Sequence, residues 1–179
     1  MSSVNPDSYC GIYCGACSVH MQGETGCPDG FTACLGSLPK SEIACGGCKS
    51  GNLYAGCRIC NFRDCALKKG ITHCVECAEY PCGMYKKWKA AARFLPHVGE
   101  AGSSLELIRR EGVEVWLAAQ KKRWSCPECG SLFSWYADAC PGCGRALAGE
   151  AYKMKGWRKL LCRIVLPLAY RKAKAKSQG

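Results

Sequence analysis

Six pairs of cysteines, each separated by two residues, constrain this chain more than any other feature. Two intervening residues let one tight turn direct both sulfur atoms at the same metal ion, so this spacing indicates metal binding rather than packing. The pairs are Cys14/Cys17, Cys45/Cys48, Cys57/Cys60, Cys74/Cys77, Cys126/Cys129 and Cys140/Cys143. The sequence therefore predicts what the protein binds, and it indicates no reaction.

A disulfide framework is the alternative for a chain in which 18 of 179 residues are cysteine. Disulfides need an oxidising compartment, but residues 1–11 have neither the basic nor the apolar segment of a signal peptide. No run approaches the roughly 18 apolar residues of a membrane span. We therefore expect a cytoplasmic protein with reduced, metal-bound cysteines and no transmembrane segment, partly stabilised by the metal itself.

The chain divides into four segments by composition. We expect a cysteine-rich metal-binding module over residues 1–82, a helical linker over 83–123, a four-cysteine zinc ribbon over 124–149, and a basic amphipathic helix with its tail over 150–179. The predicted fold class is a small, irregular, metal-stabilised α+β protein. Loops and knuckles form its first segment, and a β-hairpin forms its ribbon.

Three helices are predicted in the linker. Residues 84–95 have helical periodicity and end before a proline. Ser103 and Glu106 are spaced as a capping box for a second helix. Residues 113–120 carry another apolar stripe at helical spacing, and we interpret Trp116 and its neighbours as packing residues.

The final segment predicts an amphipathic helix over residues 151–172, which Pro167 would kink or shorten. Residues 150–179 carry nine basic side chains and one acidic side chain. The last residues, 172–179, are expected to be disordered. The apolar stripe comprises Trp157, Leu160, Leu161, Ile164, Val165 and Leu168.

The ribbon consists of two similar knuckles, in which proline follows the first cysteine and glycine follows the second. That glycine can adopt the positive φ that the turn requires. Facing each other, the knuckles predict a closed tetrahedral Zn²⁺ site. The ligands would be Cys126, Cys129, Cys140 and Cys143, and the hairpin strands would be formed by Leu132, Phe133, Trp135 and Tyr136.

The N-terminal module contains eleven cysteines that we predict as metal ligands: Cys10, Cys14, Cys17, Cys45, Cys48, Cys57, Cys60, Cys65, Cys74, Cys77 and Cys82. The spacing C-x2-C-x4-C occurs twice, beginning at Cys57 and at Cys74, and each copy is expected to end in or just before a helical turn. With Tyr9, Lys69-Gly70-Ile71 and Tyr80-Pro81, this order of cysteines resembles DUF3795, a family of cysteine-rich prokaryotic proteins of unknown function. The resemblance covers residues 9–82 and implies metal binding but no reaction.

The sequence downstream of this pattern resembles that of family members with an appended zinc ribbon. The residues that carry this resemblance are Gly112-Val113, Trp116-Leu117, Lys122-Arg123-Trp124 and Phe133-Ser134-Trp135-Tyr136. Eleven cysteines do not divide into sites of four. A twelfth ligand among His20, His73, Cys27 and Cys34 would complete three sites, but the sequence does not assign which cysteines share a metal. Cys162 is expected to be a packing residue.

Zinc and an iron–sulfur cluster both remain possible in the N-terminal module, because both accept four thiolates. The C-G-G-C knuckle and the downstream ribbon favour zinc. The C-x2-C-x4-C triplets favour an iron–sulfur cluster.

Three classes of function follow. The first is a structural or adaptor protein with a protein partner and without catalytic activity, because the chain lacks H-E-x-x-H, Walker and G-x-G-x-x-G motifs. The second is an iron–sulfur protein that transfers electrons. A radical SAM enzyme or a thioredoxin-like protein is not expected, because the sequence lacks the βα units of those folds. The third is binding of nucleic acid, or of an anionic membrane surface, through the basic linker and tail.

Overall fold

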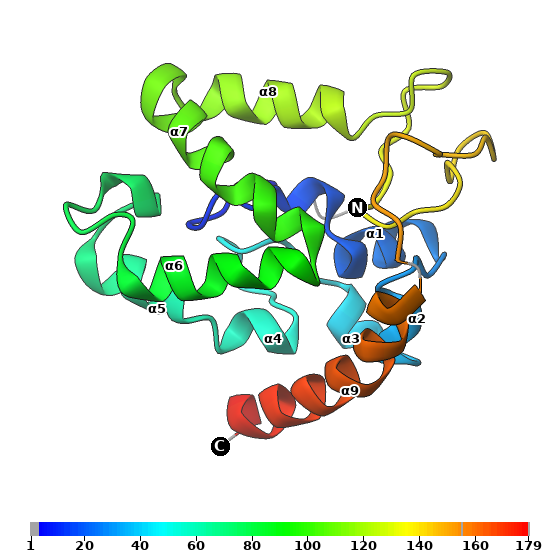
Figure 1. Ribbon diagram of the computed structural model, residues 1–179, viewed down its shortest axis with the longest axis horizontal. Coiled ribbons are helices and arrows are strands. Elements are labelled where there is room, and N and C mark those ends of the chain that lie inside the picture. Colours follow the sequence, from blue (N-terminus) through cyan, green and yellow to red (C-terminus); the bar gives the residue numbers. More distant parts are fainter. Residues whose placement is uncertain (1–3, 155, 179) are drawn as a thin grey trace.

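The structure is a computed structural model that describes residues 4–154 and 156–178. Its α-helices are α1 (Ser18–Thr25), α2 (Thr32–Leu35), α3 (Lys40–Ile43), α4 (Ala55–Arg58), α5 (Asn61–Lys69), α6 (Gly83–Lys89), α7 (Ala101–Glu111), α8 (Val113–Arg123) and α9 (Gly156–Gln178). Four 3₁₀ segments span Cys14–Ala16, Cys74–Glu76, Ala90–Arg93 and Pro96–Glu100. Figure 1 shows α7 and α8 above the cysteine-rich N-terminal segments and α9 below them.

The predicted α+β class is wrong, because residues 4–154 and 156–178 contain helices and no strand. Only two isolated bridges occur where the hairpin was expected, Ser125 with Leu132 and Ala139 with Ala146. The backbone N–H of Trp135 donates instead to the carbonyl of Ala16, in the N-terminal segment. The knuckles are therefore connected by turns that pack on the rest of the molecule.

The short N-terminal helices begin and end at the metal-binding motifs. Cys60 is the N-cap residue of α5 and Cys82 that of α6, so each C-x2-C-x4-C repeat runs into a helix as expected. Helix α5 ends at Gly70, whose φ of 64° is the left-handed conformation that stops a helix. Where loops and knuckles were expected, residues 14–76 thus contain a series of short helices that are separated by loops and turns.

The linker is helical, with boundaries that differ from the prediction. The segment expected at 84–95 is α6 followed by a 3₁₀ turn. Helix α7 begins at Ala101, and the Ser103 hydroxyl donates to the carbonyl of Glu100, so Ser103 does not cap that helix. Helix α8 occupies the predicted third position.

One buried cluster joins all four predicted segments, whose division into domains stays a prediction. Trp116 of α8 is fully buried and packs edge-on against Tyr13, with ring centroids 6.1 Å apart. Phe133 and Tyr136, from between the knuckles, are also almost fully buried. These aromatic residues pack in the core, as predicted for Trp116.

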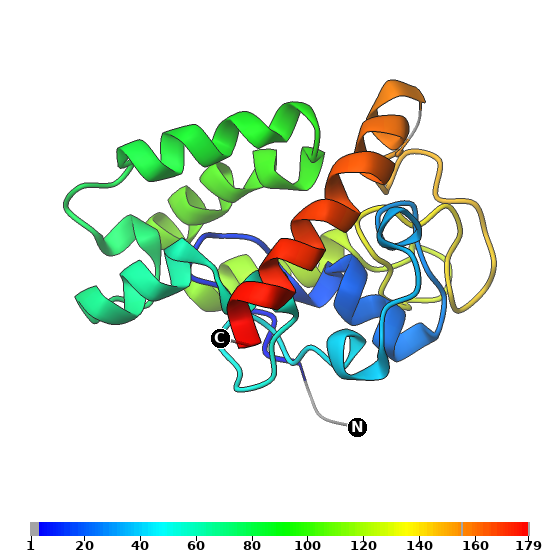
Figure 2. The same ribbon diagram turned by 90° about the horizontal axis from the view of Figure 1, so that it is seen from below.

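Helix α9 crosses the N-terminal segments and contacts α2 and α4, as Figure 2 shows. The rings of Tyr170 and Tyr54 stack with centroids 5.7 Å apart. Pro167 lies inside the helix, which continues to Gln178. The predicted disorder of residues 172–178 is therefore wrong, and residue 179 lies outside the described residues. None of the described helices is long and apolar enough to cross a membrane.

Candidate metal centres

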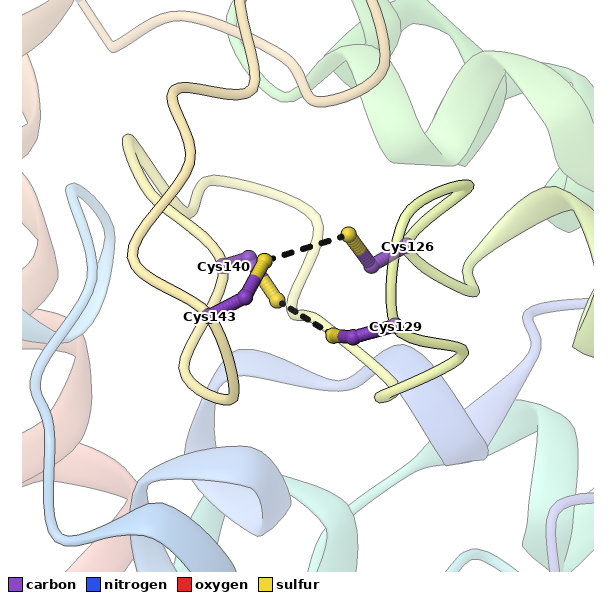
Figure 3. Close-up of side chains that lie close together, drawn as sticks. All are labelled: Cys126, Cys129, Cys140 and Cys143. Atoms are coloured by element: carbon purple, nitrogen blue, oxygen red, sulfur yellow. Dashed lines mark hydrogen bonds between the residues drawn. The ribbon is translucent and has the colours of Figure 1, made fainter.

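Four cysteines from the two knuckles between α8 and α9 form the tightest group of thiols among the residues that the structure describes (Figure 3). The Sγ atoms of Cys126, Cys129, Cys140 and Cys143 all lie within 4.8 Å of one another. Cys126 and Cys143 are 3.7 Å apart, and Cys129 and Cys140 are 3.6 Å apart. Thiolates about 2.3 Å from a tetrahedral Zn²⁺ are about 3.8 Å apart, so the cluster has the size of a closed four-thiolate site.

Local turns create this geometry. The N–H of Gly130 donates to the carbonyl of Cys126 at 2.8 Å, and the N–H of Gly144 donates to that of Cys140 at 2.9 Å. Both glycines have positive φ, 73° and 74°, as the sequence predicted. The N–H of Gly142 also points at the Cys140 sulfur, 3.4 Å away. The two knuckles therefore hold their thiols toward each other without strands.

The cluster lies where the core meets the solvent. Cys126 and Cys140 are buried, whereas Cys129 and Cys143 are exposed. The pKa of Cys129 is lowered to about 6, because the side chain and the backbone of Ser131 hydrogen-bond to its sulfur and Cys140 adds another hydrogen bond. Hydrogen bonds that point at this sulfur favour its thiolate, which is the form that binds metals.

Several N-terminal cysteines gather around Cys10 and Cys14. The N–H of Cys48 donates to the sulfur of Cys14 at 3.4 Å, which joins the C-G-G-C knuckle to the first pair. The thiol of Cys14 lies in the electrostatic neighbourhood of Cys17, Cys48 and Cys57. Cys17 and Cys57 in turn both neighbour Cys45. Cys10 is buried beside Cys48 and Cys60.

Burial favours the protonated form of the Cys14, Cys17 and Cys48 thiols by raising their pKa values. It raises the pKa of Cys17 to about 12 and that of Cys48 to about 11, and the neighbouring thiols add to the effect. Deprotonation would crowd negative charge in a poorly hydrated site, and a bound metal ion is the charge that reverses this cost. Among the residues that the structure describes, no second group of three ligand atoms is as close together as the knuckle cysteines.

The remaining N-terminal cysteines surround a small cavity beside α5 and α6. Its lining includes Cys65, Cys74, Cys77 and Cys82. Lys69 is a contributor that the predicted ligand set lacked, since its Nζ donates to the Cys77 sulfur at 3.2 Å. The only sequence signal for it was its place in the Lys69-Gly70-Ile71 motif.

The extra ligand candidates have other contacts. The Nδ1 of His20 lies 3.0 Å from the carbonyl oxygen of Cys45. His73 lies between Asp7 and Glu76, with N···O distances of 2.9 and 3.2 Å. Each ring is thus engaged by an oxygen atom of a neighbouring residue.

The cysteines outside the predicted ligand set differ in exposure. Cys27 is exposed, whereas Cys34 of α2 and Cys162 of α9 are buried where those helices meet. Cys162 is therefore a packing residue, as predicted. All 18 cysteines are free thiols in the described residues.

Comparisons with known proteins agree with the N-terminal pattern. No curated protein and no solved structure matches the chain. The cluster of Cys126, Cys129, Cys140 and Cys143 is what suggests an appended metal module downstream. Residues 7–87 match the model of DUF3795, a protein family of unknown function, which supports the family resemblance of this part of the chain.

Proposed function

We propose that this is a metal-binding protein in which Cys126, Cys129, Cys140 and Cys143 hold one structural Zn²⁺. The observation that carries the proposal is the distance of all four sulfurs, within 4.8 Å of one another. Four protein thiolates fill the tetrahedral coordination of zinc and leave no position for a substrate or a reactive water. The role of this ion would be to stabilise the fold, without catalytic activity.

A structural role suits the surroundings of the cluster. Its two knuckles are connected by turns with isolated bridges only, so few backbone hydrogen bonds hold them together. Yet Trp124 and Leu147 flank them in the core. A zinc ion would fasten both turns and thereby hold these side chains in place. A reducing cytoplasm, where such thiols stay free, is the compartment we propose.

The test is metal content together with thermal stability. We expect about one zinc ion per chain at this site, and a lower content and melting temperature in Cys126→Ser and Cys140→Ser. Cys27→Ser is the matched control, because this thiol is exposed and outside the cluster. Unchanged zinc content and stability in both ligand variants would contradict the proposal.

We further propose that the protein acts as an adaptor through the outer face of α9. Trp157, Leu160, Ile164 and Leu168 are each at least 57% exposed, which is unusual for large apolar side chains on one helix. At about 100° per residue these four side chains lie on one side of the helix. The opposite side is buried against the protein through Cys162 and Ala173. The helix is thus held on the protein while its outer apolar side faces the solvent.

An anionic membrane surface is the partner that suits this face best. Residues 156–178 contain no acidic side chain, and basic residues flank the apolar stripe: Arg158, Arg163, Arg171, Lys172 and Lys176. A helix with an apolar face and flanking cations lies in the headgroup region of anionic bilayers. Nucleic acid would pair with the cations but leave the exposed apolar side chains in water.

Vesicle sedimentation tests this second role. We expect binding to vesicles that contain phosphatidylserine and not to pure phosphatidylcholine. Both the pair Leu160→Ser with Leu168→Ser and the single change Arg163→Glu should weaken it, whereas Leu67→Ser, an exposed leucine of α5, should not. RNA binding that survives the serine pair but not Arg163→Glu would assign the face to nucleic acid. Capture of a defined protein partner, without vesicle binding, would assign it to protein.

A further inference from the structure

The cavity beside α5 and α6 is lined by four thiols that converge from three elements. Cys65 lies on α5, Cys74 and Cys77 bracket the 3₁₀ turn, and Cys82 caps α6. The cavity has a volume of about 40 Å³, and Phe62 is among the apolar side chains of its wall. A small, largely apolar cavity that is lined by four cysteines is suited to a thiolate-bound metal group.

Backbone hydrogen bonds hold these thiols in position. The N–H of Cys74 donates to the carbonyl of Tyr9 at 2.7 Å, which anchors the turn to the start of the chain. The N–H of Cys77 donates to the carbonyl of Cys74 at 3.2 Å, and Tyr80 donates to that of Cys77 at 2.9 Å. The Cys74 thiol has those of Cys65, Cys77 and Cys82 in its electrostatic neighbourhood.

Lys69 supplies positive charge at the edge of the cavity. Its ammonium group donates to the Cys77 sulfur at 3.2 Å and to Glu79 at 2.8 Å. This hydrogen bond places a positive charge in contact with the Cys77 sulfur. Hydrogen bonds to ligating sulfur also tune the reduction potential of an iron–sulfur cluster.

The separation of the thiols distinguishes this site from the knuckle cluster. Zinc needs its four thiolates about 3.8 Å apart, and the knuckle cysteines meet this condition. The cavity cysteines form no group within 4.8 Å among the described residues. In a four-iron cluster each thiolate binds a different iron, so the sulfur atoms of the four ligands are farther apart than in a zinc site.

We propose that Cys65, Cys74, Cys77 and Cys82 bind one iron–sulfur cluster, separately from the zinc of the knuckles. The cluster can enter by ligand exchange. An external thiolate ligand leaves an iron of the preformed cluster and takes the proton of a protein thiol. The protein thiolate then binds that iron, so neither iron nor sulfide changes oxidation state. The site would then be an electron-transfer or cluster-carrying centre, next to Lys69.

The test is transfer of a synthetic [4Fe–4S] thiolate complex to the full chain without oxygen. We expect about four iron and four sulfide to stay with each chain after gel filtration, with visible absorption, while the zinc content is unchanged. Cys74→Ser and Cys65→Ser should lose most of the iron. Cys27→Ser should retain it.

Two further variants keep the assignment falsifiable. Cys60 also neighbours Cys74, so iron lost in Cys60→Ser but kept in Cys65→Ser would overturn the ligand set. Lys69→Gln keeps all four thiols, and we expect it to bind the cluster with a more negative reduction potential, because a nearby cation stabilises the reduced form. Two zinc ions per chain and no retained iron would overturn the proposed iron–sulfur cluster. Retained iron without zinc at the knuckle cysteines would overturn the proposed structural zinc and leave the cluster proposal standing.

Discussion

The hydroxyl of Ser134 donates a hydrogen bond to Oδ2 of Asp29 at 2.7 Å, across 105 residues of the chain. Oδ1 of the same carboxylate accepts the backbone N–H groups of Phe31 and Thr32, both at 2.9 Å. Close by, the N–H of Trp135 donates to the carbonyl of Ala16 at 3.0 Å. The stretch between the knuckles is thereby joined to the N-terminal cysteine-rich segments.

Removing this link should weaken the whole fold. Ser134→Ala leaves one lone pair of a buried carboxylate unsatisfied, and we expect a loss of about 1.5–3 kcal/mol in the free energy of unfolding. Ser103→Ala, which removes an exposed hydrogen bond to Glu100, is the control and should change it by less than about 0.5 kcal/mol. Urea unfolding measures both. Equal effects would mean that the link contributes nothing specific.

Trp116 should be among the most sensitive core positions. It is fully buried against Tyr13, so Trp116→Ala removes a large side chain and leaves a cavity. We expect a loss of about 3–5 kcal/mol. The matched change Trp157→Ala, on the exposed face of α9, removes an edge-on ring contact with Phe94 and should cost at most about 1.5 kcal/mol. A loss at Trp157 as large as that at Trp116 would show that α9 packs differently.

His97 should make stability depend on acid. Burial lowers its pKa to about 3; its Nδ1 lies 2.7 Å from the Tyr136 hydroxyl, and its ring stacks on Trp135. The unfolded chain takes up a proton near pH 6.5 and the folded one does not, so stability falls as pH falls from about 6.5 toward 3, by up to about 1.4 kcal/mol per pH unit. The free energy of unfolding of His97→Gln, measured by urea at each pH, should fall less steeply. Parallel curves for both proteins would contradict this.

Zinc removal should loosen the knuckles before the helices. Chelation should speed amide exchange at Cys126 and Cys140, whose N–H groups bond to the carbonyls of Ser131 and Arg145, by about tenfold or more. Amides within α7 and α8 should change little, because their hydrogen bonds are internal to the helices. Hydrogen exchange with mass spectrometry distinguishes this local opening from global unfolding, in which all amides would accelerate together.

The knuckle cluster shows how far local sequence reaches. Two residues between thiols and a glycine after the second thiol decide the turn by themselves, so Cys126 with Cys129 and Cys140 with Cys143 were predictable as a four-thiol cluster. Helix α8 and the packing role of Trp116 were also predictable, because apolar periodicity along one helix reports which side is buried.

Only the tertiary structure decided what the stretch around Trp135 pairs with. Its aromatic residues suit a hairpin, but its backbone bonds to Ala16 and its side chain stacks on His97, two partners that are remote in sequence. Likewise, the sequence grouped Cys74, Cys77 and Cys82 in one triplet but placed Cys65 in the other triplet, with Cys57 and Cys60. Only the packing of α5 against α6 brings Cys65 to the same cavity as the second triplet. Spacing along the chain determines turns and pairs of ligands, whereas the sharing of a site by distant pairs depends on how the helices pack.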